Sequence, residues 1–385
     1  MRIVFFITVT ALEGSTYSLF QLIRGLRQEG VECKVIATRK GYYCDVMDKE
    51  GIPYEIIRYR NSNYPPLRTF RDKLYYLPLL ALLAENYINY HKVKSVIEEF
   101  RPDIIHTNVS PITIGYRVAK KLNIPHVWHV REYVDKDFKI KPFPSFLSLK
   151  KKLQDSYTIT ITKDVKKHFD LGNKCRAIYD GVYYENEYRF IASKKSYFLF
   201  VGFLMECKGV FDLLASYVEY CKLVDVPFEL YLVGGYTSET YDRMMSILWG
   251  TKAQPLVKII GKQDIETVKN YMQEATCMFV PSHFEGFGRI TAEAMFNGCL
   301  VAGRDTGGTK EQFDNGLNET GKEIALRFTD NKQMTRILYN LTVQRIEQYF
   351  PMIERAQNVV RKLYSIESNV HSVMKFYRDI YENNK

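Results

Sequence analysis

The chain has 385 residues, of which 46% are apolar and 25% charged, so it is long enough for two ordinary globular domains. Its seven Cys show neither a C-x-x-C pair nor metal-type spacing, which excludes a disulfide scaffold and the common zinc sites. The longest internal apolar run, 74–84, contains Pro78 and is about half of the roughly 20 residues that a membrane span needs.

The positive charge lies in the first half of the chain. Residues 1–185 hold 30 Lys and Arg against 20 Asp and Glu, which accounts for the whole net charge of +10. No zinc finger, RNP-type motif or helix-turn-helix signal is present, so we do not expect nucleic-acid binding. An anionic membrane surface or a phosphate-bearing acceptor fits the charge better.

The chain begins with an apolar segment, 1–11, that lacks the basic run of a signal peptide and is interpreted as a first strand. We therefore expect a cytoplasmic protein, either free or peripheral at the inner face of the membrane.

Apolar segments alternate with helical spacing through the first half, which predicts a doubly wound α/β sheet. The predicted strands are 2–10, 32–38, 52–58, 103–106, 125–130, 157–162 and 177–179. Predicted helices follow Gly14 and cover 112–122 and 163–169. The basic segments 60–80 and 135–152 contain proline, and we expect irregular structure there.

A basic and aromatic mixture precedes the apolar run at 74–84. Its members are Arg58, Arg60, Arg68, Arg71, Lys73, Tyr75 and Tyr76. Such a mixture can lie on a membrane surface. The alternative is a solvated loop that runs into a core helix, because surface charge runs are usually only that.

Two residues of the first half lie at predicted strand ends. Gly14 follows the first strand and is either a ligand-binding turn or a plain tight turn. His129 lies near the end of 125–130, followed by Arg131 and Glu132. Ligands of open α/β sheets bind at the carboxyl ends of strands, so we expect His129 to be functional, although most isolated histidines are structural.

The polar segment 183–195 is predicted to be a linker, and a second α/β unit follows it. Its predicted strands are 197–201, 228–233, 257–260, 277–280 and 300–302, each followed by glycine or a polar turn. Predicted helices cover 210–223 and 264–275, and most of the chain after residue 310 has helical spacing. We predict domains at 1–185 and 196–365, with a final helix, 366–385, that returns to the first domain.

The segment 281–295 combines a strand end, a glycine loop and the start of a helix. Main-chain N–H groups and the helix dipole at such a junction favour a phosphate. Glu285 and Glu293 frame the loop, and carboxylates suit the hydroxyls of a sugar or ribose. A nucleotide sugar has both kinds of group. The alternative is a pair of acids that only complements the helix dipole.

These residues resemble a known enzyme family. Glu285-Gly286-Phe287-Gly288 with Glu293 is similar to the E-x7-E signature of glycosyltransferase family 4, a group of retaining enzymes with the GT-B fold. Further resemblance lies at Gly202, Lys208-Gly209, Gly307-Gly308, Glu311, Gly14, Asp103, His106 and His129. The resemblance implies two Rossmann-like domains that face each other across a cleft, with the C-terminal helix packed on the first.

The resemblance also implies roles for individual residues. Glu293 would hold the ribose hydroxyls, Glu285 would contact the donor sugar and Lys208 would neutralise the leaving diphosphate. The N–H groups of Gly286, Phe287, Gly288, Arg289 and Ile290 would hold the distal phosphate. His129 would position the sugar, and Gly14 would let the main chain of the first domain approach the phosphates. Gly202, at the first turn of the second domain, would be one of the donor-binding residues.

One position departs from the family pattern. Phe203 stands where the family usually has a basic residue, so Arg289 or Arg304 would have to supply that charge. We find no acidic cluster of the D-x-D type and expect transfer without a metal or other cofactor.

The sequence therefore predicts a retaining glycosyltransferase that uses a nucleotide sugar and a glycan or lipid-linked acceptor in cell-surface polysaccharide or glycolipid biosynthesis. Two alternatives stay open at this point. One is a nucleotide-sugar epimerase of the same fold, and the other is a non-catalytic sugar- or lipid-binding subunit.

Overall fold

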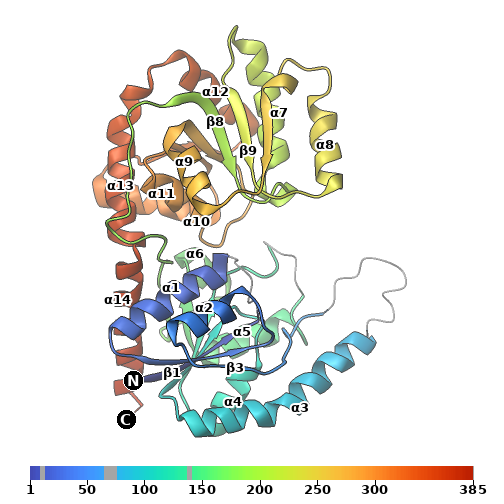
Figure 1. Ribbon diagram of the computed structural model, residues 1–385, viewed down its shortest axis with the longest axis vertical. Coiled ribbons are helices and arrows are strands. Elements are labelled where there is room, and N and C mark those ends of the chain that lie inside the picture. The colour runs from blue at the N-terminus through green and yellow to red at the C-terminus, as the bar shows by residue number, and fades with distance from the viewer. Residues whose placement is uncertain (9–13, 65–75, 137–140, 385) are drawn as a thin grey trace. The chain divides into compact units, whose positions relative to one another are not determined.

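The computed structural model describes residues 1–8, 14–64, 76–136 and 141–384 (Figure 1). The chain forms two compact units, unit 1 with Met1–Gly181 and Ile366–Lys385, and unit 2 with Val182–Ser365. Each unit has one parallel sheet covered by helices, which confirms the predicted α/β class with two Rossmann-like domains.

Unit 1 contains a seven-stranded sheet in the order β3-β2-β1-β4-β5-β6-β7. Its strands are β1 Arg2–Ile7, β2 Glu32–Ala37, β3 Tyr54–Ile56, β4 Ile104–Asn108, β5 His126–Val130, β6 Tyr157–Thr160 and β7 Cys175–Ala177. Its helices are α1 Gly14–Gln28, α2 Tyr42–Glu50, α3 Tyr76–Phe100, α4 Ile114–Leu122, α5 Phe146–Asp155, α6 Lys163–His168 and α14 Ile366–Glu382.

The central strand β1 is apolar at successive positions because helices cover both of its faces. Val4 and Phe6 belong to the core cluster that includes Val93 of α3 and Val118 of α4. Phe5 points the other way and packs against His106, whose ring lies against α14. A continuous apolar run is therefore what this buried position requires.

The last helix of the chain, α14, packs on unit 1. A Cβ atom on Gly25 of α1 would lie 2.3 Å from Val370 of α14, so the two helices touch closely. Tyr377 also makes a 2.6 Å hydrogen bond to Nδ1 of His106. The predicted return of the C-terminal helix to the first domain is confirmed.

Unit 2 contains a six-stranded sheet in the order β10-β9-β8-β11-β12-β13. Its strands are β8 Lys195–Val201, β9 Glu229–Val233, β10 Val257–Gly261, β11 Ala275–Val280, β12 Val301–Arg304 and β13 Leu326–Phe328. Its helices are α7 Val210–Leu223, α8 Ser238–Leu248, α9 Ile265–Glu274, α10 Arg289–Phe296, α11 Gly307–Thr320, α12 Asn331–Val343 and α13 Phe350–Tyr364.

The predicted loop at 135–152 is wrong over its second part, where α5 begins at Phe146. Ser145 caps this helix by accepting a 3.1 Å hydrogen bond from the N–H of Ser148. Leu149 and Leu153, four residues apart, are buried against the sheet. The three consecutive lysines 150–152 separate these two leucines, so the apolar spacing was not recognised in the sequence. Helices α2 and α8 were also missed, and both are short and bounded by turns.

Residues 183–195, predicted to be a linker, lie against unit 2. The carbonyl of Arg189 accepts a 2.7 Å hydrogen bond from Gln357, and its N–H donates to Phe296. Lys194 donates to the carbonyls of Gln273 and Gly298. The predicted linker is thus an irregular segment that is held on unit 2 by hydrogen bonds and by the ring contacts of Tyr183 with Phe296 and of Phe190 with Phe350.

We predict that Arg131→Met destabilises unit 1 by about 3–5 kcal/mol, because Asp180 would keep a buried charge without a partner. Arg131 Nη1 lies 2.6 Å from Asp180 Oδ2, and both side chains are nearly inaccessible. Urea unfolding followed by the buried Trp128, in a Trp249→Phe background, measures the change.

The matched control for this prediction is Lys120→Met, which removes one partner of the exposed ion pair with Asp155. It should leave the free energy of unfolding almost unchanged, because solvent screens an exposed pair. An equally small loss for Arg131→Met would contradict the prediction.

Candidate functional site

The turn after β8 places Lys208 beside the loop that follows β11. Residues Glu206–Lys208 form a single 3-10 turn, and Gly209 ends it in a left-handed conformation with φ of 74°. A Cβ atom on Gly209 would lie 2.2 Å from the carbonyl oxygen of Pro281, so only glycine permits this contact. A 3.0 Å hydrogen bond from His283 N–H to the carbonyl of Cys207 also joins the two turns.

Lys208 and Glu285, which the sequence predicted to be catalytic, are in direct contact. Nζ of Lys208 lies 2.7 Å from Oε1 of Glu285. Ser282 donates a 2.8 Å hydrogen bond to the same carboxylate oxygen. The Glu285 side chain is 14% exposed and that of Lys208 is 34% exposed, so the pair is partly desolvated but open to a ligand. Both residues come from turns at the carboxyl ends of strands.

Glu293 lies one turn into α10 and pairs with Arg289 at the start of the same helix. Nη2 of Arg289 is 3.3 Å from Oε1 of Glu293, and both side chains are mostly buried. Gly288 precedes the helix with φ of 79°, a conformation that favours glycine. The junction therefore combines a helix N-terminus, one cation and one carboxylate, which together suit a phosphate next to a diol.

The start of α11 holds the carbonyl side of the loop. Gly308 N–H donates a 2.8 Å hydrogen bond to the carbonyl of Glu285. The Gln312 amide donates to the carbonyls of Phe287 and Gly288, at 2.6 and 3.1 Å. Gln312 is 1% exposed. These contacts direct the carbonyls of Glu285, Phe287 and Gly288 toward α11. Gln312 was not among the residues predicted from the sequence.

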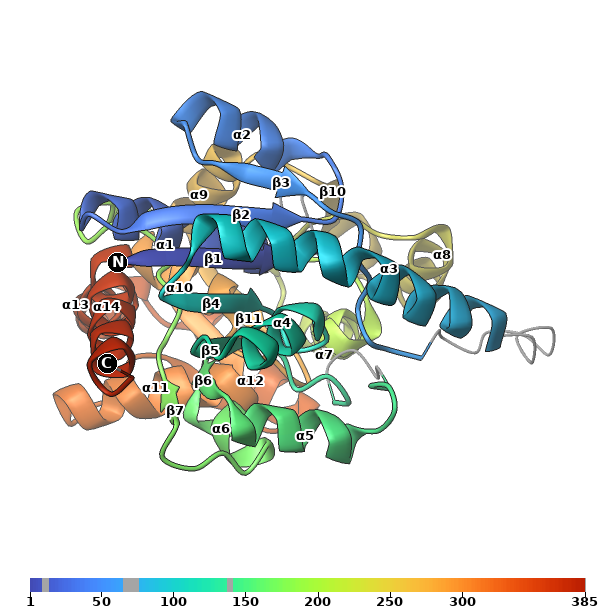
Figure 2. The same cartoon turned by 90° about the horizontal axis from the view of Figure 1, so that it is seen from below.

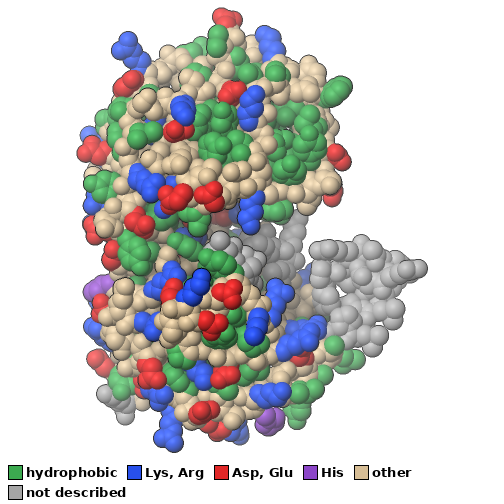
Figure 3. All heavy atoms as spheres, viewed as in Figure 1, with side chains coloured by type: hydrophobic (Ala, Val, Ile, Leu, Met, Phe, Trp, Pro, Cys, Tyr) green, Lys and Arg blue, Asp and Glu red, His purple; other side chains and the backbone are tan. Residues whose placement is uncertain are grey.

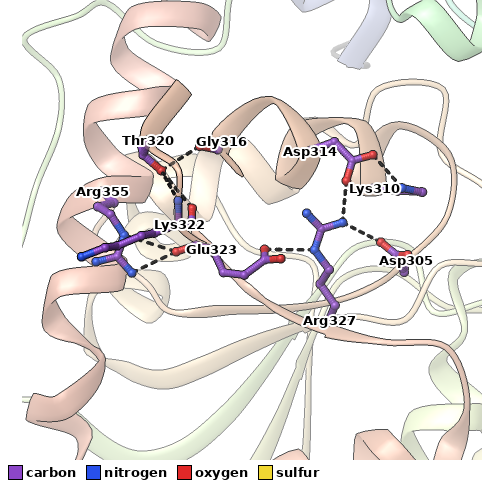
Figure 4. A network of polar contacts seen from close by, with 9 residues as sticks. All are labelled: Asp305, Lys310, Asp314, Gly316, Thr320, Lys322, Glu323, Arg327 and Arg355. Carbon is purple, nitrogen blue, oxygen red and sulfur yellow. Dashed lines mark hydrogen bonds and ion pairs between the residues drawn. The ribbon is translucent and has the colours of Figure 1, made fainter. Parts of the chain in front are cut away.

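An ion-pair network fixes α11 to the sheet (Figure 4). Arg327 of β13 contacts Asp305 at 2.8 Å, Asp314 of α11 at 2.7 Å and Glu323 at 3.0 Å. Because Asp305 follows β12, the guanidinium joins two strand ends to α11. The position of the helix that carries Gln312 is thus set by charge-assisted hydrogen bonds.

Arg304, one of the two residues predicted to replace a missing cation, has a local role. Its guanidinium contacts Asp212 at 2.7 Å and the carbonyls of Pro281 and Thr329. His283 also binds Asp212, with Nε2 2.9 Å from Oδ2. Arg304 therefore joins the loop after β11 to α7 and to the segment after β13, and both Arg289 and Arg304 are mostly buried in ion pairs.

Phe203, the departure from the family pattern, is 48% exposed and lies against Gly235. The turn after β9 approaches the turn after β8 so closely that a Cβ atom on Gly234 would lie 1.8 Å from the carbonyl oxygen of Gly202. Gly202 itself has φ of 146°. Gly202 is thus in main-chain contact with the next strand end, and its predicted part in donor binding stays a prediction.

In unit 1, Gly14 is the exposed first residue of α1, and its carbonyl accepts a hydrogen bond from Ser18. The residues that join it to β1, 9–13, lie outside the described part of the chain. Whether Gly14 contacts a nucleotide stays a prediction.

His129 lies near the end of β5 and is fully buried. Its Nδ1 is 3.4 Å from Arg131, its ring packs on His106, and its Nε2 has no hydrogen-bond partner. Burial, with a smaller effect of Arg131, holds the pKa of His129 well below its ordinary value, so the imidazole is neutral. Arg131 in turn bonds to Asn108 and Asp180. The predicted contact of His129 with a sugar stays a prediction.

The structure brings the unit 2 residues together at one sheet edge, namely Gly202, Lys208, Glu285, Gly286, Phe287, Gly288, Arg289, Ile290 and Glu293. Within residues 1–8, 14–64, 76–136 and 141–384, no group of three His, Cys, Asp or Glu side chains has metal-binding geometry. The site combines two cations, Lys208 and Arg289, with two carboxylates and a helix N-terminus, which suits a diphosphate that carries hydroxyl groups.

Two family models match successive parts of the chain. The model for Glycosyltransferase Family 4 matches residues 12–183, and the model for Glycosyl transferases group 1 matches residues 186–325. The sequence is also 25% identical over 318 residues to an uncharacterized glycosyltransferase of Methanocaldococcus jannaschii, an alignment that covers 74% of this chain and 80% of the relative.

Solved structures share the fold over the whole chain. Anabaena HepE, crystallised with UDP and glucose, has a TM-score of 0.75 at 16% identity and covers 98% of this chain and 100% of its own. A Rickettsia africae glycosyltransferase has a TM-score of 0.77 at 16% identity, with 99% of each chain covered. Sucrose-phosphate synthase of Thermosynechococcus elongatus has a TM-score of 0.74 at 16% identity, again with 99% of each covered. The chain therefore belongs to the family 4 glycosyltransferases, nucleotide-sugar glycosyltransferases with the GT-B fold.

Proposed function

We propose that the protein moves a sugar from a nucleoside-diphosphate sugar to a hydroxyl of a glycan or lipid-linked acceptor, with retention at the anomeric carbon. The observation that carries this proposal is the contact of Lys208 with Glu285 beside the glycine loop and the N-terminus of α10. Breaking a sugar–phosphate bond puts negative charge on the diphosphate and positive charge on the sugar. One cation and one carboxylate side by side can stabilise both.

Each part of the donor has its own proposed contact in the site. The N–H groups of 286–290 and the Arg289 guanidinium bind the distal phosphate, and Lys208 neutralises the leaving diphosphate. Glu293 accepts the ribose hydroxyls, and Glu285 lies beside the sugar. That HepE was crystallised with UDP and glucose, and separately with UDP-glucose, supports UDP as the first nucleotide to test.

The acceptor side of the proposal rests on charge. Unit 1 contains nearly all of residues 1–185, which hold 30 Lys and Arg against 20 Asp and Glu. A phosphate-bearing or lipid-linked acceptor at the cytoplasmic face of a membrane complements this charge. We therefore place the reaction in cell-surface polysaccharide or glycolipid biosynthesis, and we propose that it needs no divalent metal.

We predict that Lys208→Met and Glu285→Gln each lower kcat/KM by at least about 100-fold, because each removes a group that stabilises developing charge. Release of nucleoside diphosphate from a panel of nucleotide sugars, with and without acceptor, measures the effect. Rates in EDTA and in Mg²⁺ should be equal, and NMR of the transferred sugar should show the anomeric configuration of the donor.

Lys222→Met is the matched control for Lys208→Met, since Lys222 forms an exposed ion pair with Glu219 in the same unit. It should leave the rate unchanged. Absence of both turnover and nucleoside-diphosphate binding in the wild-type protein would overturn the proposed function.

Glu293→Gln should remove the preference for a ribose diol. In the wild-type protein we expect UDP to bind about tenfold more tightly than 2′-deoxy-UDP, because the carboxylate accepts the missing hydroxyl. In the variant, calorimetry should give similar affinities for the two nucleotides. A preference for UDP that persists in Glu293→Gln would assign the ribose contact to another residue.

Gln312→Met should raise the donor KM about tenfold, although Gln312 is buried behind the loop and acts only by positioning it. The variant loses the two hydrogen bonds from the Gln312 amide to the carbonyls of Phe287 and Gly288, so the main chain of the loop is no longer held in one orientation. A structural role alone would lower the unfolding midpoint without changing KM. Restoration of KM by Gln312→His, which can still donate, would support positioning.

A further inference from the structure

Helix α3 exposes apolar side chains along the first half of its length. Leu80, Leu83, Tyr87 and Ile88 are 60%, 38%, 65% and 63% exposed. Their spacing of three, four and one residues places them on one side of the helix, and Ala84, also exposed, lies among them. We name these five residues the α3 stripe. A monomeric soluble protein rarely leaves such a contiguous apolar surface uncovered.

The opposite side of α3 is already used. Leu79, Leu82, Asn86, Val93 and Ile97 are buried and recur at helical spacing toward the sheet. The α3 stripe is thus additional to the face that the core requires. It stops after Ile88, because the exposed positions that follow are His91, Lys92, Ser95, Glu98 and Glu99. The outer surface of α3 changes from apolar to polar along one helix.

Basic side chains border the α3 stripe on the neighbouring helices. The guanidinium of Arg117 in α4 lies over the ring of Tyr90 in α3, 5.5 Å from its centre. Asp155 of α5 joins α4 through Tyr116 and Lys120. The three helices therefore lie side by side, as Figure 2 shows. Their exposed basic residues are Lys92, Arg117, Lys120, Lys121 and Lys151, and their exposed acidic residues are Glu98, Glu99 and Asp155, of which Asp155 pairs with Lys120.

A groove of about 530 Å³ opens between α4 and α5. Tyr116, Ser145, Leu147, Ser148, Lys151, Lys152 and Asp155 line it. Lys152 is half-buried, and within the described residues no carboxylate pairs with it; its pKa is lowered by burial and by the nearby Arg117. Leu147 is 60% exposed at the rim. The groove thus offers cations to an anionic group and an apolar rim to what carries it.

We propose that the outer face of α3, α4 and α5 docks on an anionic lipid bilayer, with the α3 stripe in the interface and the α4–α5 groove on a lipid phosphate. Apolar and basic groups in adjacent strips match the acyl and phosphate layers of such a surface. A second copy of this chain is less suitable, because it would bring the same cations against each other. Figure 3 shows hydrophobic and basic side chains together on the outer part of unit 1.

This surface differs from a membrane span. Among the helices that the structure describes, none has the length and apolar character to cross a bilayer. The inference deepens the proposed function and rests on it for the lipid-linked acceptor alone. Binding to vesicles is measured without sugar transfer, so either proposal can fail while the other holds.

The test is sedimentation of the full-length protein with phosphatidylcholine vesicles that contain phosphatidylglycerol. We expect binding to these vesicles, little binding to phosphatidylcholine alone, and weaker binding at high salt. Leu80→Gln with Ile88→Gln should lower the partition coefficient at least about tenfold by removing two inserted side chains. Lys121→Gln with Lys151→Gln should weaken binding to the anionic vesicles only.

Leu223→Gln with Val226→Gln is the matched control, because both residues are exposed apolar side chains of unit 2. It should bind vesicles like the wild-type protein. Equal loss in this control, or equal binding of both vesicle types by the wild-type protein, would overturn the proposal. So would a wild-type dimer that ignores vesicles and dissociates in the Leu80→Gln, Ile88→Gln variant.

A second measurement reports on insertion without removing apolar side chains. Tyr87→Trp places a fluorophore on the α3 stripe, and lipids brominated on the acyl chain should quench it in the anionic vesicles. Tyr241→Trp, on an exposed position of α8 in unit 2, should stay unquenched. Absence of quenching at position 87 while the protein is bound would show that another face docks.

Discussion

The site of unit 2 depends on the close approach of two turns, where Gly209 lies against the carbonyl of Pro281. No side chain fits between them, since a Cβ atom would lie 2.2 Å from that oxygen. This contact sets Lys208 against Glu285 and joins the turn after β8 to the loop after β11. Main-chain packing therefore fixes the positions from which Lys208 and Glu285 reach each other, so little side-chain entropy is lost when the ion pair forms.

Helix α11 fixes the main chain of the glycine loop by hydrogen bonds. Gly308 and Gln312 of α11 bind its carbonyls, and Arg327 fastens α11 to the ends of β12 and β13. In the proposed donor complex, a loop whose carbonyls are already bonded would need little reorganisation to bind a phosphate. Arg327, on the strand after α11, supports this loop through α11.

In unit 1, the buried polar residues and the charged exterior are separate. Its interior holds a cluster of buried polar side chains. His106 of β4 packs on His129 of β5 and bonds to Tyr377 of α14, and Arg131 pairs with Asp180. Its exterior carries the net positive charge and the α3 stripe. The buried polar residues and the proposed membrane-docking residues are therefore different, so mutations can test unit 1 stability and vesicle binding separately.

The sequence by itself determined the α/β class, the two Rossmann-like units and the strand–glycine–helix junction at 281–295. Buried parallel strands read as apolar runs, and glycine marks turns whatever the surrounding fold. It also located Lys208, Glu285 and Glu293. Only the tertiary structure decided that Gln312 and Arg327 support the loop, that α5 is a helix and that the α3 stripe is exposed. Burial and partners of a side chain depend on segments distant in sequence, which no local pattern contains.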